Sequence, residues 1–342
     1  MPRTLNTYGD ISPRTAAYVA KQLLERGQFL MTIERFGQAK TVPKNNTQVV
    51  TFRRYESLPR ATSPLAEGVP PTGSNLVPTD VSATLQQYGD WVPITDVIAD
   101  THEDPVLKEV TDMCGEQAAE TIEAIRISKL TGGTNVFYAN AVATRLLVTS
   151  TVSRGDLRRI TRALNKYKAR TISQIVSASA NVATEPVDAA FFAMCHTDLD
   201  ADIRNVDNFV SSEYYSKSGS ALPGEIGKVE NIRFITTPLF DPWLAAATSI
   251  SSTSWLSNGV VPGAGAAPDV YPILITGQNA YGIVPLQGSN AVVPMVKNPG
   301  QPSVGDPVGQ IGFVSWKTWQ TAIILNNLWM ARYEVAATGN PT

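Results

Sequence analysis

Histidine and cysteine are scarce in this sequence, with two residues of each among 342 positions. A secreted protein of this length that relied on disulfides would normally carry more cysteine, so Cys114 and Cys195 are interpreted as reduced, buried thiols. His102 and His196 leave little with which to build a nucleophilic or metal-dependent centre. The chain also lacks both a run of about 18 apolar residues and an apolar leader segment. We therefore expect a protein made in a cytoplasm, without a membrane span and without a standard export signal.

The acidic clusters do not complete a known catalytic or metal-binding motif. Asp198, Asp200 and Asp202 resemble the start of a calcium loop, but Ile203 and Phe209 stand where an EF-hand needs glycine and glutamate. A solvated, acidic helix start explains this cluster better. The chain contains no phosphate-binding loop of the Gly-x-x-x-x-Gly-Lys-Ser/Thr type and no Gly-x-Ser-x-Gly nucleophile turn. We predict no catalytic, cofactor-binding or metal-ligating residues, the histidines and cysteines included.

Charge is also sparse, with 17% charged residues and a net charge of -2, but it is unevenly distributed. Residues 1–60 hold ten Lys or Arg against four Asp or Glu, so this segment is basic and the remainder is acidic. A basic arm on an acidic body suits nucleic acid, and it equally suits docking onto an acidic copy of the same protein. Both interpretations stay open at this point.

Two helices are predicted in the first 130 residues. Residues 12–27 begin with a Ser-Pro pair and end at a glycine, but their apolar stripe is too narrow to build a domain. Residues 1–46 are therefore interpreted as an arm that needs a partner. The clearest helix spans 104–130, about 40 Å, and carries one apolar and one acidic side. Its apolar side is made by Val106, Leu107, Val110, Met113, Cys114, Ile122, Ile125 and Leu130.

A basic helix is predicted from Ser153, with Asp156 as its capping partner. Its outer side carries seven Arg or Lys residues up to Arg170. Tyr167 is the only aromatic residue there, so the helix lacks the stacking residues of a single-strand binder. If this helix meets DNA it meets phosphates without sequence preference, and a solvated basic face is an equally good interpretation.

Residues 47–56 and 81–98 have the β-branched and aromatic content typical of two strands. The stretch between them, 57–80, contains five prolines and almost no hydrophobic periodicity. We predict a long projecting hairpin, because loops of this length are uncommon inside a compact domain unless they serve a purpose. The alternative is the lid of an enzyme.

The rest of the chain mixes helix and strand without regular alternation. We predict a short acidic helix over 197–204 and strands at 189–194, 229–236, 271–276 and 322–335. Residues 248–268 are rich in Ser, Gly and Ala, which is typical of a flexible surface excursion. This irregular order favours an α+β fold over a doubly wound sheet.

Several phrases, spread in order from about residue 12 to residue 326, resemble the major capsid proteins of the N4-like family of tailed bacteriophages. They include SPRTAAYVAKQLLERG, FGQAKTVPKN, FRRYESLPRAT, PLAEGVPPTG, QQYGDWVPITD, GEQAAETIEAI and DPVGQIGFVSWKTWQTAIILN. The resemblance implies the Hong Kong 97 type capsid fold. The expected division is an N-terminal arm at 1–46, an extended β-hairpin loop at 47–98, a peripheral domain with a spine helix at 99–185, an axial domain at 186–310, and a C-terminal strand at 311–342 that returns to the peripheral domain.

The function that the resemblance implies is self-assembly into the icosahedral shell that encloses the double-stranded DNA of a tailed bacteriophage. Such a subunit forms the hexamers and pentamers of the shell, has no active centre or cofactor, and belongs to the virion after assembly in the host bacterial cytoplasm. Further expected partners are separate scaffolding, portal and decoration proteins, with non-specific contact to the packaged DNA. The alternatives are a portal, decoration or tail protein, and an enzyme with a lid at 57–80.

The predicted assembly interface joins basic and acidic groups of adjacent subunits. Its members are Arg14, Lys21, Arg26, Arg35, Arg53 and Arg54 on the basic side, and Glu67, Glu109, Asp112, Glu116, Glu120 and Glu123 on the acidic side. The last five acids recur at three- and four-residue steps, so they fall largely on one helical side. We expect the arm to bind this acidic flank in a neighbouring copy, through pairs worth about 0 to 1 kcal/mol each. An arm that faces inward and binds packaged DNA is the competing hypothesis.

Overall fold

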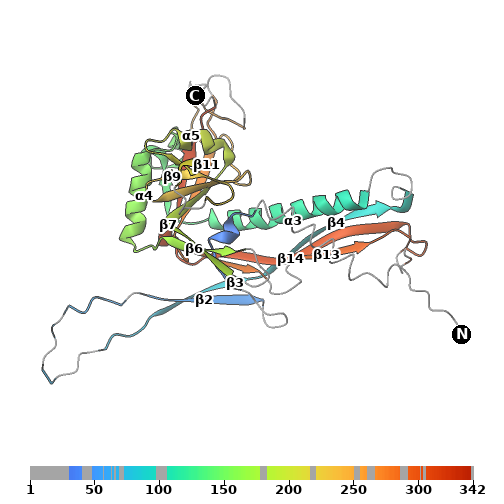
Figure 1. Ribbon diagram of the computed structural model, residues 1–342, viewed down its shortest axis with the longest axis horizontal. Coiled ribbons are helices and arrows are strands. Elements are labelled where there is room, and N and C mark those ends of the chain that lie inside the picture. Colours follow the sequence, from blue (N-terminus) through green and yellow to red (C-terminus); the bar gives the residue numbers. More distant parts are fainter. Residues whose placement is uncertain are drawn as a thin grey trace.

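Two β-sheets and one long helix make up most of the computed structural model (Figure 1). The structure describes residues 31–40, 48–56, 58–62, 64, 67–68, 73–97, 106–177, 183–215, 221–249, 255–259, 266–285, 292–300, 302 and 306–339. The predicted helix over 12–27 lies outside the described residues, as do the first two residues of the predicted helix over 104–130.

A mixed eight-stranded sheet forms the part of the molecule that we call the head. Its strands are, in spatial order, β5 (Val136–Tyr138), β15 (Met330–Ala336), β11 (Val270–Thr276), β7 (Ala183–Cys195), β10 (Ile232–Thr236), β9 (Glu225–Val229) and β8 (Val210–Ser211), with β6 (Ile172–Ser177) paired to β7. The β5–β15 and β7–β10 pairs are parallel and the other pairs are antiparallel. This mixture agrees with the predicted α+β class and is not the all-parallel sheet of a doubly wound fold.

The helices α4 (Arg154–Lys166) and α5 (Asp200–Arg204) belong to the head. Leu157, Ile160 and Leu164 of α4 are fully buried in the same core as Phe191 and Tyr333 of the sheet. The predicted start of α4 is confirmed, because the Ser153 side chain accepts a hydrogen bond from the Asp156 backbone N–H at 3.2 Å. Short turns complete the chain path at Ile33–Arg35, Ala139–Ala141, Arg145–Leu147, Thr197–Leu199, Ser212–Tyr214 and Asn327–Trp329.

A second sheet, which we call the long sheet, extends away from the head (Figure 1). Its central strand β14 (Ile311–Ile324) pairs antiparallel with β4 (Gln86–Thr95), β13 (Val292–Lys297) and β12 (Tyr281–Pro285), and β1 (Gln38–Ala39) pairs with β12. The helix α3 (Val106–Leu130) covers one face. There Cys114 and Ala118 pack against Val314 and Trp316. Met113 was expected on the apolar side of this helix. It is 64% exposed, so that expectation is wrong.

The predicted hairpin is confirmed over β2 (Val49–Tyr55) and β3 (Pro78–Thr84), which pair antiparallel. Figure 1 shows the described part of the segment between them projecting beyond the two larger sheets. The single strand predicted over 81–98 is wrong, because the chain changes sheets at Leu85: β3 pairs with β2, whereas β4 pairs with β14. Leu85, at the change of sheet, is buried in the same apolar cluster as Val284.

Three further expectations need correction. The run at 322–335 is interrupted between β14 and β15 by the turn at Asn327–Trp329, where the Asn326 side chain accepts from the Leu328 N–H. The strand expected over 229–236 is present as β10 but begins only at Ile232, because Val229 ends β9 and the chain turns through Glu230 with a positive φ of 55°. The expected boundary between residues 185 and 186 falls inside β7, and α4 packs in the head instead of beside α3.

Candidate assembly interface

The base of the β2–β3 hairpin is anchored on the long sheet by a small apolar core. Val50 and Phe52 of β2 are buried there with Val284 of β12. Phe52 lies over Gly282, where an added Cβ would come 2.7 Å from the ring. On the hairpin itself, the Arg53 guanidinium donates two hydrogen bonds of 2.8 Å to the Asp80 carboxylate. The hairpin therefore leaves the body from a fixed base.

Beyond that base, the hairpin presents apolar side chains that no core covers. Tyr55, Leu58, Leu76 and Val77 are each more than half exposed. Glu67, a predicted interface residue, is exposed in the same projecting segment. Clustered exposed apolar side chains of this kind mark interaction surfaces in soluble proteins.

The face of the long sheet opposite α3 is the second exposed apolar surface, and we call it the open face. Side chains alternate along a strand, so the covered positions Ile94, Val314 and Trp316 place Trp91 and Phe313 on the other side. Trp91 is 58% exposed. Its ring packs edge to face on that of Phe313, with the ring centroids 6.3 Å apart. Met295 and Ile311 are also exposed on this side, and the half-buried Lys297 and Lys317 lie on the same side.

The acidic side of α3 is present, but one predicted member is not on it. Glu109 and Glu120 are exposed, and Asp112 and Glu116 are half-buried. These four residues are called the acidic flank below. Glu123, in contrast, is fully buried. Its expected role at the exposed interface is therefore wrong, and its carboxylate has partners within the chain.

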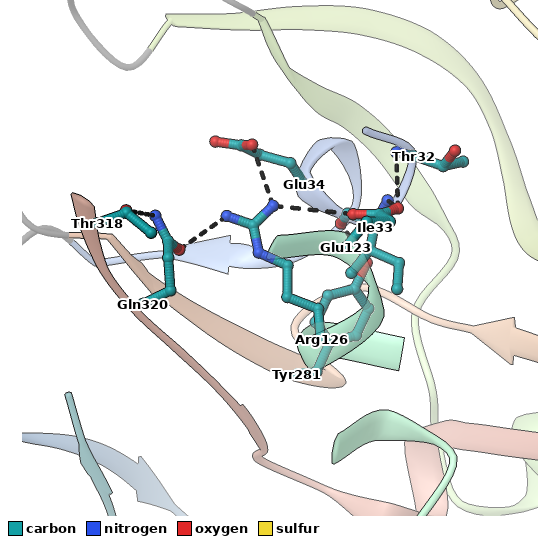
Figure 2. Close-up of polar contacts among 8 residues, drawn as sticks. All are labelled: Thr32, Ile33, Glu34, Glu123, Arg126, Tyr281, Thr318 and Gln320. Carbon is teal, nitrogen blue, oxygen red and sulfur yellow. Dashed lines mark hydrogen bonds and ion pairs between the residues drawn. The ribbon is translucent and has the colours of Figure 1, made fainter. Parts of the chain in front are cut away.

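Glu123 holds the backbone of residues 32–33 against α3 (Figure 2). Its Oε1 atom accepts hydrogen bonds from the N–H groups of Thr32 and Ile33, both at 2.8 Å. The Tyr281 hydroxyl donates to the Ile33 carbonyl at 2.7 Å, and burial raises the pKa of this hydroxyl well above its usual value. We call this group of contacts the arm junction.

Arg126, one turn along α3, links the arm junction to the long sheet (Figure 2). Its guanidinium lies 3.1 Å from Glu34, donates to the Gln320 side chain at 3.0 Å, and lies 3.9 Å from Glu123. Two carboxylates therefore share one guanidinium. Burial raises the pKa of Glu123, although Arg126 and the two N–H donors oppose that effect.

The remaining predicted interface residues are divided among several places. Arg14, Lys21 and Arg26 lie outside the described residues. Arg35 donates to the Pro223 carbonyl at 3.0 Å within the chain, and its role at the interface stays a prediction. Arg54 faces the Leu325 carbonyl at 3.5 Å. Among the described residues, those of the predicted interface lie in separate places, and the predicted contact between copies stays a prediction.

The described part of the chain holds no group of three metal-ligating side chains. Cys114 and Cys195 are buried free thiols whose pKa is raised by burial. The acidic cluster at 198–202, expected to be solvated, makes intrachain hydrogen bonds in part. Asp198 accepts one from the Tyr271 hydroxyl at 2.7 Å, and Asp202 accepts one from the Thr338 N–H at 2.8 Å. None of the described helices is long and apolar enough to cross a membrane.

A family model for phage capsid proteins matches residues 78–325, from the hairpin to the end of the long sheet. The chain belongs to this family. It is a capsid protein, a structural component of the virion shell, and family membership confirms the prediction that it is not an enzyme. The major capsid protein of Pseudomonas phage KPP21 is 23% identical over 236 residues, which cover 64% of this chain and 57% of that protein. This capsid protein therefore spans a little more than half the length of that relative.

Solved structures show the fold of this capsid protein. The capsid of Ralstonia phage GP4 matches with a TM-score of 0.65, 12% identity, and coverage of 92% of this chain and 93% of that chain. The capsid of cyanophage P-SCSP1u matches with a TM-score of 0.55, 13% identity and coverage of 90% and 89%. An encapsulin complex from Synechococcus elongatus matches at 0.51, with 10% identity and coverage of 98% and 92%. The mixed α+β architecture is thus the Hong Kong 97 type capsid fold, as predicted.

Proposed function

We propose that this capsid protein is the major capsid protein of a tailed bacteriophage, and that its copies close an icosahedral shell of hexamers and pentamers around double-stranded DNA. The head would serve as the axial domain, and the long sheet with α3 as the peripheral domain. The N4-like assignment rests on the sequence phrases quoted above. Scaffolding, portal and decoration proteins remain proposed partners.

The observation that carries this proposal is a pair of exposed apolar surfaces on one chain. The β2–β3 hairpin, which carries Tyr55, Leu58, Leu76 and Val77, projects at one end of the molecule, and the long sheet with its open face extends toward the other end (Figure 1). They are too far apart to cover each other within one copy. Two different patches that fit each other between copies make a head-to-tail contact, which closes rings when the rotation permits.

We further propose that residues 57–80 of one copy lie on the open face of the next. Apolar area supplies the contact, at roughly 25 cal/mol for each Å² removed from water. Charge supports the same pairing, because Glu67 is exposed in the projecting segment and the open face carries Lys297 and Lys317. A surface pair of this kind contributes about 0 to 1 kcal/mol.

The test replaces residues 57–76 by Asn-Gly, a two-residue turn that suits antiparallel strands. We expect a folded, soluble subunit that no longer closes shells in electron micrographs. The single substitution Trp91→Ala on the open face should give the same defect with the hairpin intact. Val210→Ala, at an exposed apolar position of the head, is the control that should assemble normally. Normal shells from the shortened hairpin would end the proposal for this contact.

A further inference from the structure

The outer side of α4 is a basic surface that the described part of the chain neutralises only in part. Leu157, Ile160 and Leu164 face the core, so the opposite side of the helix faces outward. It carries Arg158, Arg162 and Lys166 at four-residue steps, all exposed. Lys168 and Arg170 continue the exposed charge just beyond the helix.

One intrachain carboxylate already serves two arginines on this side. Glu230 lies 2.7 Å from the Arg154 guanidinium and 2.9 Å from that of Arg158, and these contacts lower the pKa of its carboxyl. Arg162 and Lys166 form no salt bridge with another described residue. The surface therefore has an excess of positive charge that suits an anionic partner.

The position of α4 indicates which partner that is. In the view down the shortest axis of the molecule, α4 runs along the outer margin of the head, on the side toward which the hairpin projects (Figure 1). A thin subunit in a closed shell turns its broad faces inward and outward and its margins toward neighbours. The basic side of α4 thus faces a second copy and not the interior where DNA would lie.

We propose that the basic side of α4 binds the acidic flank of α3 in the adjacent copy. The inference rests on the proposed hairpin contact, because it uses the same neighbour. α4 lies above the hairpin in Figure 1, and α3 lies above the long sheet. A hairpin placed on the neighbour's long sheet therefore brings α4 level with the neighbour's α3.

The charges on the two helices have matching spacing. Arg158, Arg162 and Lys166 repeat every four residues, about 6 Å along a helix axis. Asp112, Glu116 and Glu120 repeat at the same interval on α3. Two helices that cross at a small angle can therefore pair several charges at once. Each pair is weak, but a shell repeats the contact in every subunit.

The experiment is charge reversal in the full-length chain. Arg162→Glu with Lys166→Glu should leave a folded subunit and reduce closed shells at least tenfold in electron micrographs of the purified protein. The matched control is Arg204→Glu with Lys228→Glu, which makes the same change in net charge elsewhere on the exposed surface of the head. The control should assemble like the unmodified chain.

Reversal of the partner completes the design. Glu116→Lys with Glu120→Lys should also fail to assemble, and combining it with the α4 reversal should restore shells. Normal assembly of the α4 variant overturns the inference, as does a variant that forms normal empty shells but packages less DNA. The same Glu116→Lys, Glu120→Lys change can also be combined with Arg14→Glu, Lys21→Glu in the arm. If it restores shells to that arm variant and not to the α4 variant, the partner of the acidic flank is the arm and the inference is overturned. If the α4 variant assembles while the shortened hairpin does not, the inference fails and the proposed function stands.

Discussion

At the scale of single residues, the buried carboxylate of Glu123 decides whether residues 32–33 stay attached to α3. Removing it in Glu123→Ala leaves the N–H groups of Thr32 and Ile33 without an acceptor in a buried place. We expect destabilisation of about 1–3 kcal/mol for each N–H that stays unsatisfied. Urea unfolding of the monomeric subunit measures the loss. Glu120→Ala, at an exposed position of the same helix, is the control and should stay within about 0.5 kcal/mol of the unmodified chain.

Glu123→Gln gives a test of protonation at the same atom. The pKa of Glu123 is raised by burial in the folded chain above its unfolded value of about 4.3. The stability that this group contributes is therefore fully present below the unfolded pKa and is lost as pH rises through the raised folded pKa. Glutamine mimics the protonated carboxyl, so the unmodified chain should lose stability relative to Glu123→Gln as pH rises above the unfolded pKa of about 4.3. A difference between the two proteins that grows in the opposite direction would contradict the raised pKa.

The burial of Glu123 could have been predicted from the helical periodicity of the sequence, although the charge of Glu123 by itself suggests an exposed residue. Glu116 and Glu120 have the same chemistry and recur at similar steps. Glu123, however, stands four residues after Ala119 and four before Ile127, and both are buried. Helical periodicity thus places it on the covered side of α3, and here periodicity is the stronger indicator. The partners of Glu123 were not predictable, because residues 32–33 are about ninety positions away in the chain.

At the scale of elements, Phe52 is the side chain that holds the hairpin on the long sheet. It is 6% exposed, and Phe52→Ala would remove most of the contact with Gly282. We expect a local loss of about 3–5 kcal/mol, the usual cost of truncating a buried phenylalanine. Hydrogen exchange should then accelerate at β2 and β3 and stay unchanged at β7 and β11 of the head.

Tyr55→Ala is the matched control for that experiment, because Tyr55 lies three residues along the same strand and is more than half exposed. Its exchange rates should equal those of the unmodified chain. If exchange accelerates throughout the head of Phe52→Ala, the hairpin base and the head unfold together. That result would contradict the expectation from their separate apolar cores.

The sequence indicates elements well where local chemistry marks their ends. Ser153 and Asp156 define the start of α4, and the proline-rich stretch at 57–80 defines the hairpin. No glycine, proline or turn residue marks the change of sheet at Leu85. That change depends on β14, more than two hundred residues later, so only tertiary contacts determine it. At Asn326 a local signal is present, because two consecutive asparagines favour the turn between β14 and β15, but the prediction of one strand over 322–335 overlooked it.

At the scale of the whole molecule, two kinds of contact would act together in a shell. The hairpin and the open face offer apolar area, whereas α4 and the acidic flank offer charge. Neither set is part of a described core, so variants in them should fold and fail only in assembly. Weak contacts of this kind become decisive through repetition in a closed object.

Salt should separate the two contacts. The screening length falls from about 10 Å at 0.1 M to about 3 Å at 1 M salt, and exposed charge pairs are weakened accordingly. Light scattering measures the rate and extent of shell assembly. The difference in assembly between the unmodified chain and Arg162→Glu with Lys166→Glu should therefore be smaller at 1 M NaCl, because the unmodified chain also loses the charged contact there. The defect of Trp91→Ala should persist, since apolar burial is not screened. A charge-reversal defect that is unchanged at 1 M, or a Trp91→Ala defect that disappears, would contradict this division between the margin of the head and the open face.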